Sequence, residues 1–358
     1  MKKKLLIFGY TLDMGGAEKA LTDTINYLVK DYDVDLYLLK KEGCLLDSVP
    51  DCVNIGVLRK NIFSYILFRY IPFYRKYKIN KIANKKDYYA ALGYMEGRSA
   101  TWVADIKKPI KKFAWIHNDV SKFDIGINEK EIIDSYNKVD KVICVSKDAK
   151  DIFCDVYSIP SSKVEVIYNY IDEDTILKKS NEFKVDNKVF TIVNVAKMRD
   201  QKRHDRLIYA AKYLKELDYD FKLQLVGDGP NFDRIKELVN EYDLSDKVEL
   251  LGLKSNPYPY IKNADLFVLS SSHEGYGIVV KEALLLKTPV LSTLTTGPRE
   301  ILENEKYGII VPNDDYSIAH KLKEILDNKD MLSKYKKALD EYEGDNKKIV
   351  EQTLNLLK

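Results

Sequence analysis

The sequence contains few of the residues that build disulfide frameworks or metal centres. Its 358 residues include four cysteines, at positions 44, 52, 144 and 154, and no Cys-x-x-Cys pair. Cysteines so widely separated predict neither a zinc site nor a set of disulfide bonds. They fit a protein of the reducing cytoplasm.

Long hydrophobic runs and an excess of one charge are also missing. No stretch approaches the roughly 18 uninterrupted apolar residues that a membrane-spanning helix needs. The N-terminal segment MKKKLLIFGYTLDMGG has neither a full apolar core nor a cleavage site, so we expect it to belong to the fold. A net charge of +3 is too small to predict a nucleic-acid partner.

The composition is that of a soluble folded chain, with 45% hydrophobic and 32% charged residues of nearly balanced sign. A chain of this length is too long for one ordinary core and predicts two domains of roughly 150 to 190 residues each.

Short β-branched or aliphatic runs alternate with amphipathic segments of helical length, which is typical of parallel α/β sheets. The pattern occurs twice and predicts two Rossmann-like domains. We expect strands at 4–9, 34–39, 88–93, 112–117, 141–146 and 164–169 in the first sheet, and at 190–196, 222–227, 248–253, 265–270, 289–292 and 308–312 in the second.

The polar segment between the two sets has no apolar run long enough for a core strand. We therefore expect an N-terminal domain over 1–170, a linker over 171–187 and a C-terminal domain over 188–342. Residues 343–358 have helical spacing and are expected to form a terminal helix that packs back toward the N-terminal domain.

Glycine turns and a basic cluster follow several of these strands. Gly15 and Gly16 precede a helix expected to begin near Ala17, where they form either a tight turn or a surface for a phosphate or sugar. Gly227 belongs to a G-x-G that lacks the third glycine of a dinucleotide fingerprint, so no nicotinamide cofactor is predicted.

The cations Lys197, Arg199, Lys202 and Arg203 follow the strand at 190–196 and precede a helix. A helix N-terminus favours anions, so these cations are best explained by an anionic ligand that lies between them and the helix. A solvated loop is the alternative.

Two glutamates, Glu274 and Glu282, lie eight positions apart around a glycine-containing turn. If Gly275, Tyr276, Gly277 and Ile278 form the first turn of a helix, their N–H groups can face a diphosphate. Glu282 would then accept hydrogen bonds from ribose hydroxyls and Glu274 from those of a bound sugar. The alternative is a capping glutamate and an exposed helical one.

These motifs resemble those of the retaining, nucleotide-sugar-dependent glycosyltransferases of family 4, also called glycosyl transferases group 1, which have the GT-B fold. The segment EGYGIVVKEAL matches the E-x7-E motif of the family through Glu274 and Glu282. The segments GGAE (15–18), VGDGP (226–230) and TGPREIL (296–302) match as well, so the resemblance spans nearly the whole chain.

One motif departs from the family pattern. Where the family has G-R-L-x-x-x-K-G, this chain has AKMRDQKRH: Lys202 matches the lysine, Lys197 replaces the arginine and Arg203 replaces the glycine. A lysine supplies charge without the bidentate fork of arginine, and Arg199 is positioned to compensate.

The resemblance implies that a nucleotide sugar, with UDP as the carrier, binds the C-terminal domain and that the acceptor binds the N-terminal domain. It implies transfer with retention of configuration and no metal, with Lys197, Lys202 and Glu274 acting at the leaving group and sugar. The loop 252–258, with Leu253 and Lys254, is expected to contact the base.

His117 follows a strand in the segment WIHND. It matches an active-site histidine of the family, although a lone histidine is more often a packed core residue. Two other functions fit the same architecture: a nucleotide-sugar epimerase, which needs no acceptor, and a non-catalytic binder, which would neither transfer nor hydrolyse the sugar.

Residues 59–86 contain nine Lys or Arg, seven Phe or Tyr and no acidic residue. Solvated helical faces normally mix both signs of charge, and no RNA-binding signature accompanies this segment. We expect Arg69, Arg75, Lys76 and Lys78 to hold the protein on the inner face of an anionic membrane, where it would meet a lipid-linked glycan. The high lysine, asparagine, isoleucine and tyrosine content points to an AT-rich bacterial genome and a cell-surface polysaccharide pathway.

Overall fold

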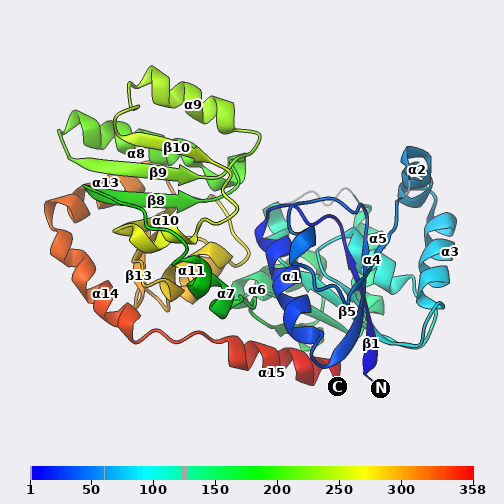
Figure 1. The fold of residues 1–358 in the computed structure, drawn as a ribbon. Helices are drawn as coiled ribbons and strands as arrows, with labels where there is room; N and C mark the ends of the chain where they lie inside the picture. Colours follow the sequence, from blue (N-terminus) through cyan, green and yellow to red (C-terminus); the bar gives the residue numbers. More distant parts are fainter. Residues whose placement is uncertain (1, 60, 123–126) are drawn as a thin grey trace. The chain divides into compact units, whose positions relative to one another are not determined.

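The computed structural model describes residues 2–59, 61–122 and 127–358, which form two compact units (Figure 1). Unit 1 consists of Met1–Ile171 and Asn346–Lys358, and unit 2 of Asp172–Asp345. In the described ranges, no helix is long and apolar enough to cross a bilayer.

The described part of unit 1 contains a seven-stranded parallel sheet with the order β3-β2-β1-β4-β5-β6-β7. Its strands are β1 (Lys3–Gly9), β2 (Tyr32–Leu38), β3 (Asn54–Val57), β4 (Tyr88–Gly93), β5 (Lys111–Ile116), β6 (Lys141–Cys144) and β7 (Val164–Val166). All the strands predicted for this domain are present. The edge strand β3 was not predicted, because its sequence NIGV is short and only partly buried.

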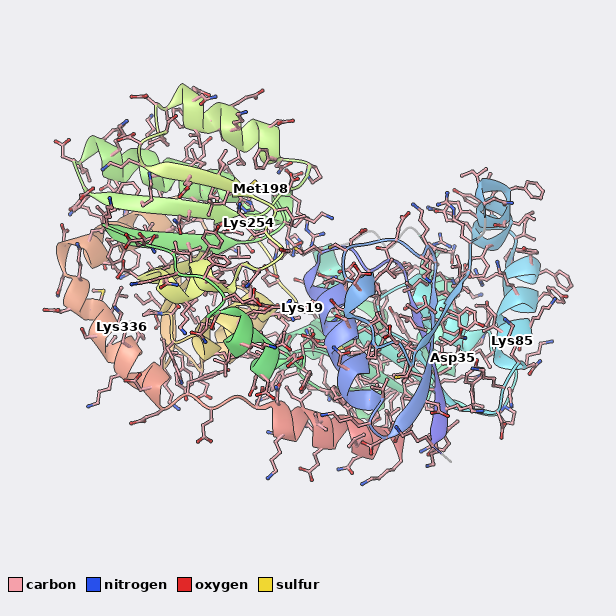
Figure 2. All side chains as sticks on the ribbon, in the orientation of Figure 1. Lys19, Asp35, Lys85, Met198, Lys254 and Lys336 are labelled. Carbon is pink, nitrogen blue, oxygen red and sulfur yellow. The ribbon has the colours of Figure 1, made fainter. Side chains whose placement is uncertain are left out.

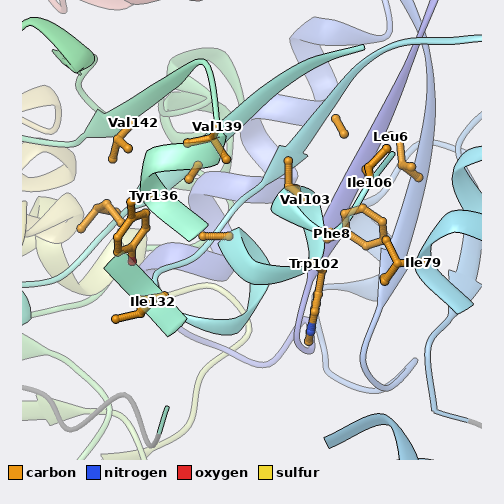
Figure 3. Packing of buried hydrophobic residues seen from close by; sticks show 14 of the residues in the cluster. Leu6, Phe8, Ile79, Trp102, Val103, Ile106, Ile132, Tyr136, Val139 and Val142 are labelled. Atoms are coloured by element: carbon orange, nitrogen blue, oxygen red, sulfur yellow. The ribbon is translucent and has the colours of Figure 1, made fainter. Parts of the chain in front are cut away.

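Helices cover this sheet around a core of aromatic and aliphatic side chains. They are α1 (Gly16–Leu28), α2 (Ile62–Tyr70), α3 (Pro72–Ala83), α4 (Arg98–Ala104), α5 (Glu129–Lys138), α6 (Lys147–Tyr157) and α15 (Asn346–Leu357), with short 3-10 turns η1 (Leu46–Ser48), η2 (Val120–Lys122) and η3 (Ser161–Lys163). Figure 3 shows part of the core, in which the ring centroids of Phe8 and Trp102 lie 6.2 Å apart.

The terminal helix α15 belongs to unit 1, as the sequence predicted. It is anchored where it begins, because the Asn346 side chain donates a hydrogen bond of 2.7 Å to the carbonyl of Ile171. Ile349 and Leu357 are buried.

The described residues of unit 2 include a six-stranded parallel sheet with the order β10-β9-β8-β11-β12-β13. All six strands were predicted: β8 (Phe190–Val195), β9 (Phe221–Val226), β10 (Val248–Gly252), β11 (Leu266–Leu269), β12 (Val290–Thr293) and β13 (Gly308–Val311). The helices are α7 (Glu173–Lys179), α8 (His204–Glu216), α9 (Phe232–Glu241), α10 (Tyr258–Asn263), α11 (Ile278–Leu285), α12 (Thr296–Ile301), α13 (Ser317–Asp327) and α14 (Ser333–Asp340), with 3-10 turns η4 (Asp200–Lys202) and η5 (Lys329–Leu332).

Residues 172–187 of the expected linker belong to unit 2, where they contribute α7. Ile176 is the buried residue of this helix, while Leu177 beside it is exposed, and two adjacent apolar residues give no helical periodicity that the sequence can reveal.

The helices α2 and α3 form a neighbouring pair in unit 1 (Figure 1). Two of the four cations predicted to bind a membrane are not exposed on this pair. Arg75 is 4% exposed, and its guanidinium donates to the carboxylates of Asp105 and Glu131, each at 2.8 Å. Lys78 is half-buried and donates to the carbonyl of Leu58. Neither cation is therefore available to a membrane, whereas the Lys76 side chain is 53% exposed.

The reason lies in the helical spacing of α3. Arg75 is one turn before Ile79 and two turns before Ile82, and both isoleucines belong to the buried face of the helix. A charge on that face must find partners inside the protein, and Arg75 does so.

We predict that Arg75→Met destabilises unit 1 by about 3–5 kcal/mol, because it leaves Asp105 and Glu131 without their buried partner. The measurement is urea unfolding followed by tryptophan fluorescence, which reports on unit 1 because both tryptophans of the chain, Trp102 and Trp115, lie there. An exposed lysine of the same helix provides the control: Lys81→Met should change stability by less than about 0.5 kcal/mol. A loss of stability in Arg75→Met as small as that of the control would contradict a structural role for Arg75.

Candidate active site

The candidate site lies where the strand order of the unit 2 sheet reverses. The first strand β8 lies between β9 and β11, so chain connections leave in opposite directions on its two sides. In open parallel sheets, ligands bind beyond the carboxyl ends of the strands at this point. The loops that follow β8 and β11 carry the predicted basic cluster and Glu274.

These two loops are joined by an ion pair. The Lys202 ammonium donates to the carboxylate of Glu274, and the side chains are 14% and 7% exposed. Glu274 also accepts a hydrogen bond of 2.6 Å from the Ser271 hydroxyl. The Ser270 hydroxyl donates to the backbone carbonyl of Lys202 at 2.7 Å. The structure thus brings together two residues that are 72 positions apart and that the sequence assigned to one site.

The second glutamate lies one turn inside α11. Glu282 is 5% exposed, and the Tyr258 hydroxyl donates to it at 3.5 Å. The helix begins at Ile278 with Gly277 as its N-cap, at a φ of 81°. The predicted first turn was therefore too long, because Gly275 and Tyr276 belong to the loop before the helix.

A close backbone approach holds this loop in place. A Cβ atom at Gly297, in the segment TGPREIL, would lie 2.2 Å from the Cα of Tyr276, so no larger residue fits at position 297 without a shift of the backbone. The Thr296 hydroxyl also donates to the carbonyl of Glu274.

The remaining basic residues divide into two groups. The side chains of Lys197 and Arg199 are exposed at the same loop. The backbone of Arg203 adopts the left-handed conformation with a φ of 47°, which suits the glycine of the family motif. Its guanidinium contacts the carboxylates of Asp205 at 2.9 Å and Asp315 at 2.6 Å. Asp205 and Asp315 raise the pKa of Arg203. Arg203 thus has its own carboxylates and does not join Lys197, Arg199 and Lys202.

The other predicted donor residues lie at the carboxyl ends of neighbouring strands. Gly227 has a φ of 149°, and a Cβ there would lie 2.0 Å from the carbonyl oxygen of Ala196. Leu253 is exposed and Lys254 half-buried after β10. Figure 2 shows Lys254 in the same region of unit 2 as Met198, which follows β8.

In unit 1, the glycine pair lies between β1 and α1. Gly15 is the N-cap of α1 in an extended conformation, and Gly16 is the first helical residue. A Cβ at Gly15 would meet only the flexible side chain of Glu18, at 2.2 Å. The geometry fits both a tight turn and a ligand contact.

His117 directly follows β5 and is 6% exposed. Its backbone N–H donates to the carboxylate of Glu96 at 3.0 Å, and its ring centroid lies 4.9 Å from that of Tyr94. Both ring nitrogens are buried without a hydrogen-bond partner among the described residues. Burial lowers the pKa of His117 to about 3, so the ring is neutral at neutral pH.

Sequence reasoning missed two residues beside these sites. Glu96 orients the His117 segment from the loop after β4, and it also accepts a hydrogen bond from the side chain of Asn118. His204 begins α8 next to the basic loop and is 3% exposed; its pKa is lowered to about 4 by burial and by the charge of Lys202. The one feature of the sequence that could have indicated Glu96 and His204 is that each follows a predicted strand.

Clusters of at least three His, Cys, Asp or Glu side chains able to hold a metal ion are absent from the described part of the chain.

Comparison with known proteins identifies the family. The model of Glycosyltransferase Family 4 matches residues 14–175, and that of Glycosyl transferases group 1 matches residues 175–342. The chain is a family 4 glycosyltransferase. The epimerase and non-catalytic alternatives are thereby set aside.

The family 4 glycosyltransferase has relatives among bacterial enzymes. It is 29% identical to the N-acetylgalactosamine-N,N'-diacetylbacillosaminyl-diphospho-undecaprenol 4-alpha-N-acetylgalactosaminyltransferase of Campylobacter jejuni, over 93% of each chain. It is 26% identical to the poly(ribitol-phosphate) alpha-N-acetylglucosaminyltransferase of Staphylococcus aureus, over 70% of this chain and 51% of that protein. HepE of Anabaena, solved with UDP and glucose, superposes with a TM-score of 0.78 at 19% identity over 99% of both chains, which confirms the GT-B fold.

We predict that His117 makes unit 1 less stable in acid. The folded protein keeps this ring neutral down to a pKa of about 3, whereas an unfolded histidine binds a proton near pH 6.5. The unfolded state therefore binds more protons between these values, and stability is complete above pH 6.5 and falls as the pH decreases below it.

The contribution of one such histidine is about 1.4 kcal/mol per pH unit within this window. Urea unfolding followed by tryptophan fluorescence at pH 7 and pH 5 should show a smaller acid loss in His117→Gln than in the wild type. His320→Gln, at an exposed histidine of unit 2, is the control and should behave as the wild type. An unchanged acid loss in His117→Gln would contradict the buried neutral state.

Proposed function

We propose that this glycosyltransferase moves a hexosyl or N-acetylhexosaminyl unit from a UDP-sugar to a lipid-linked glycan, with retention of configuration and without a metal ion. The observation that carries the donor assignment is the buried Lys202–Glu274 pair at the reversal of strand order, together with the buried Glu282 of α11. The relatives support the UDP carrier and the lipid-linked acceptor: the name of the Campylobacter enzyme describes a diphospho-undecaprenol substrate, and HepE was solved with UDP.

Each residue of the donor site has a chemical task. Glu282 accepts hydrogen bonds from the ribose hydroxyls, and the N-terminus of α11 faces the diphosphate together with Lys197, Arg199 and Lys202. Glu274 accepts hydrogen bonds from the hydroxyls of the transferred sugar. Lys202 thus exchanges part of its contact with Glu274 for the phosphate when the donor binds.

The reaction breaks the bond between the anomeric carbon and the diphosphate oxygen and forms a bond from that carbon to the acceptor oxygen. The leaving diphosphate gains negative charge, which Lys202 and the α11 N–H groups stabilise. The proton of the acceptor hydroxyl passes to the leaving phosphate on the same face of the sugar, which preserves the configuration. His117 is a neutral hydrogen-bonding partner for a sugar hydroxyl.

The donor assignment is tested by calorimetric titration with UDP and with uridine. We expect Glu282→Gln to weaken UDP binding by about 1.5–3 kcal/mol, because a charged acceptor of ribose hydroxyls is lost. Lys202→Met should weaken UDP binding but leave uridine binding unchanged, because it acts on the phosphates. Lys212→Met, at an exposed lysine of α8, is the matched control.

If the folded Glu282→Gln variant binds UDP with the same affinity as the wild type, Glu282 does not contact the ribose. Turnover of a panel of UDP-sugars then identifies the sugar, with the product anomer read by proton NMR. Inversion at the anomeric carbon, or activity abolished by EDTA and restored by a divalent cation, would contradict the proposed mechanism.

The surface of α2 and α3 supports the proposed location at a membrane. Its large apolar side chains are exposed to an unusual degree: Ile62 63%, Phe63 67%, Ile66 47%, Tyr70 64%, Phe73 82% and Tyr77 58%. Exposed apolar patches mark interaction surfaces, and aromatic rings favour the bilayer interface. The absence of acidic residues from segment 59–86 favours an anionic bilayer over a protein partner.

We predict that the exposed apolar side chains of α2 and α3 hold the enzyme on the membrane more strongly than the basic residues predicted from the sequence. In co-sedimentation with vesicles that contain anionic phospholipid, the double substitution Phe63→Ser and Phe73→Ser should reduce partitioning at least tenfold, because each buried Phe contributes up to about 1.5–3 kcal/mol. Tyr316→Ser, at a tyrosine of unit 2 that is 74% exposed, should have no effect. Absence of wild-type binding at low salt would refute the membrane location.

A further inference from the structure

A cavity of about 230 Å³ opens in unit 1 at the carboxyl edge of the sheet. Tyr10, which follows β1, forms one wall, and Arg98 and Trp102 of α4 form another. The remaining lining residues are Leu39, which follows β2, and Tyr65, Phe68 and Arg69 of α2. The strand order of unit 1 reverses beside β1, so the cavity lies where open parallel sheets bind ligands.

The cavity combines two positive charges with aromatic walls. The seven described residues that line it include Arg69 and Arg98 and no acidic residue. The Arg69 guanidinium donates to the Tyr65 hydroxyl at 2.6 Å, while its buried Nε has no partner among the described residues. The pKa of Arg98 is lowered, mainly by burial and secondly by the positive charge of Arg69.

Two guanidinium groups that repel each other across a cavity are stabilised by an anion between them. The planar guanidinium fork fits the oxygens of a phosphate better than a point charge does. A third arginine adds to the positive potential, because Arg59 stacks on the ring of Tyr65 with 4.8 Å to its centroid.

The aromatic walls determine what is attached to that anion. The ring of Trp102 lies 5.4 Å from that of Tyr10 and 5.5 Å from that of Phe68, so the three form a continuous apolar surface. The volume is below the roughly 300 Å³ at which pockets hold a whole drug-sized ligand. The cavity therefore has room for a charged group and the carbon atoms next to it, and not for an entire glycan.

We infer that this cavity binds the phosphate or diphosphate ester of the glycosyl acceptor, with Arg69 and Arg98 on the anion and Tyr10, Phe68 and Trp102 on the adjoining carbon atoms. The inference rests on the proposed function, since it assigns the cavity to the acceptor. The ester belongs either to an isoprenoid lipid or to a polyol phosphate. The exposed apolar side chains of α2, on the same helix as Arg69, favour the lipid.

The test is a titration of the full chain, with saturating UDP, followed by the fluorescence of Trp102, one of two tryptophans in the chain. Farnesyl diphosphate represents the lipid ester, glycerol phosphate the polyol ester, and farnesol the same lipid without charge. We expect farnesyl diphosphate to bind at least tenfold more tightly than farnesol. Arg69→Gln and Arg98→Gln should each weaken its binding at least tenfold, and Lys81→Gln, at an exposed lysine of α3, should not.

Tighter binding of glycerol phosphate than of farnesyl diphosphate supports the anion site and assigns it to a polyol phosphate. Equal binding of farnesol and farnesyl diphosphate, or wild-type binding by both arginine variants, overturns the inference. Calorimetry with UDP separates this result from the proposed function: a chain that binds UDP in unit 2 but no ester in unit 1 refutes only the acceptor pocket. A chain that binds no UDP refutes the donor assignment, and the ester titration is then repeated without UDP.

Discussion

The ion pair between Lys202 and Glu274 is the interaction on which the proposed donor site depends. It joins the loops of two adjacent strands where the strand order of the unit 2 sheet reverses, with both side chains largely removed from water. Burying two charges costs about as much desolvation energy as their attraction returns, so the pair is a poor source of stability. Its effect is to hold one cation and one anion in fixed positions, where the proposed donor would need them for a phosphate and a sugar hydroxyl. The start of α11 and the approach of Gly297 to Tyr276 complete the same arrangement.

Sequence patterns predicted most of this architecture because parallel strands are buried on both faces and appear as continuous apolar runs. The exceptions were elements without such runs. The edge strand β3 has the sequence NIGV and is only partly buried, and α7 contributes a single buried isoleucine. Their positions are set by neighbours that are distant in sequence. Motif spacing located Glu274, Glu282 and Lys202, but the contact between Glu274 and Lys202 needed the sheet topology.

The basic segment shows where sequence composition stops being informative. Pro72 divides it into two helices, and each helix has its own buried face. Arg75 consequently pairs with Asp105 and Glu131, Arg69 faces a cavity and the Lys76 side chain stays 53% exposed. All three read as members of one patch in the sequence, because charge and aromatic content do not record the direction of a side chain. The exposed hydrophobic side chains of α2 and α3 support the proposed membrane surface more directly than these cations do.

The two units supply different electrostatics to the proposed reaction. Unit 2 provides charge, because the departing diphosphate gains negative charge and Lys202 with the N–H groups of α11 can stabilise it. Next to β5, unit 1 provides a neutral imidazole, since burial keeps His117 unprotonated. A neutral ring can donate with one nitrogen and accept with the other, so in the proposed reaction it would orient a sugar hydroxyl without adding a positive charge to unit 1. Desolvation of His117 and ion pairing of Lys202 thus give the two units different proposed tasks, which are positioning in unit 1 and charge stabilisation in unit 2.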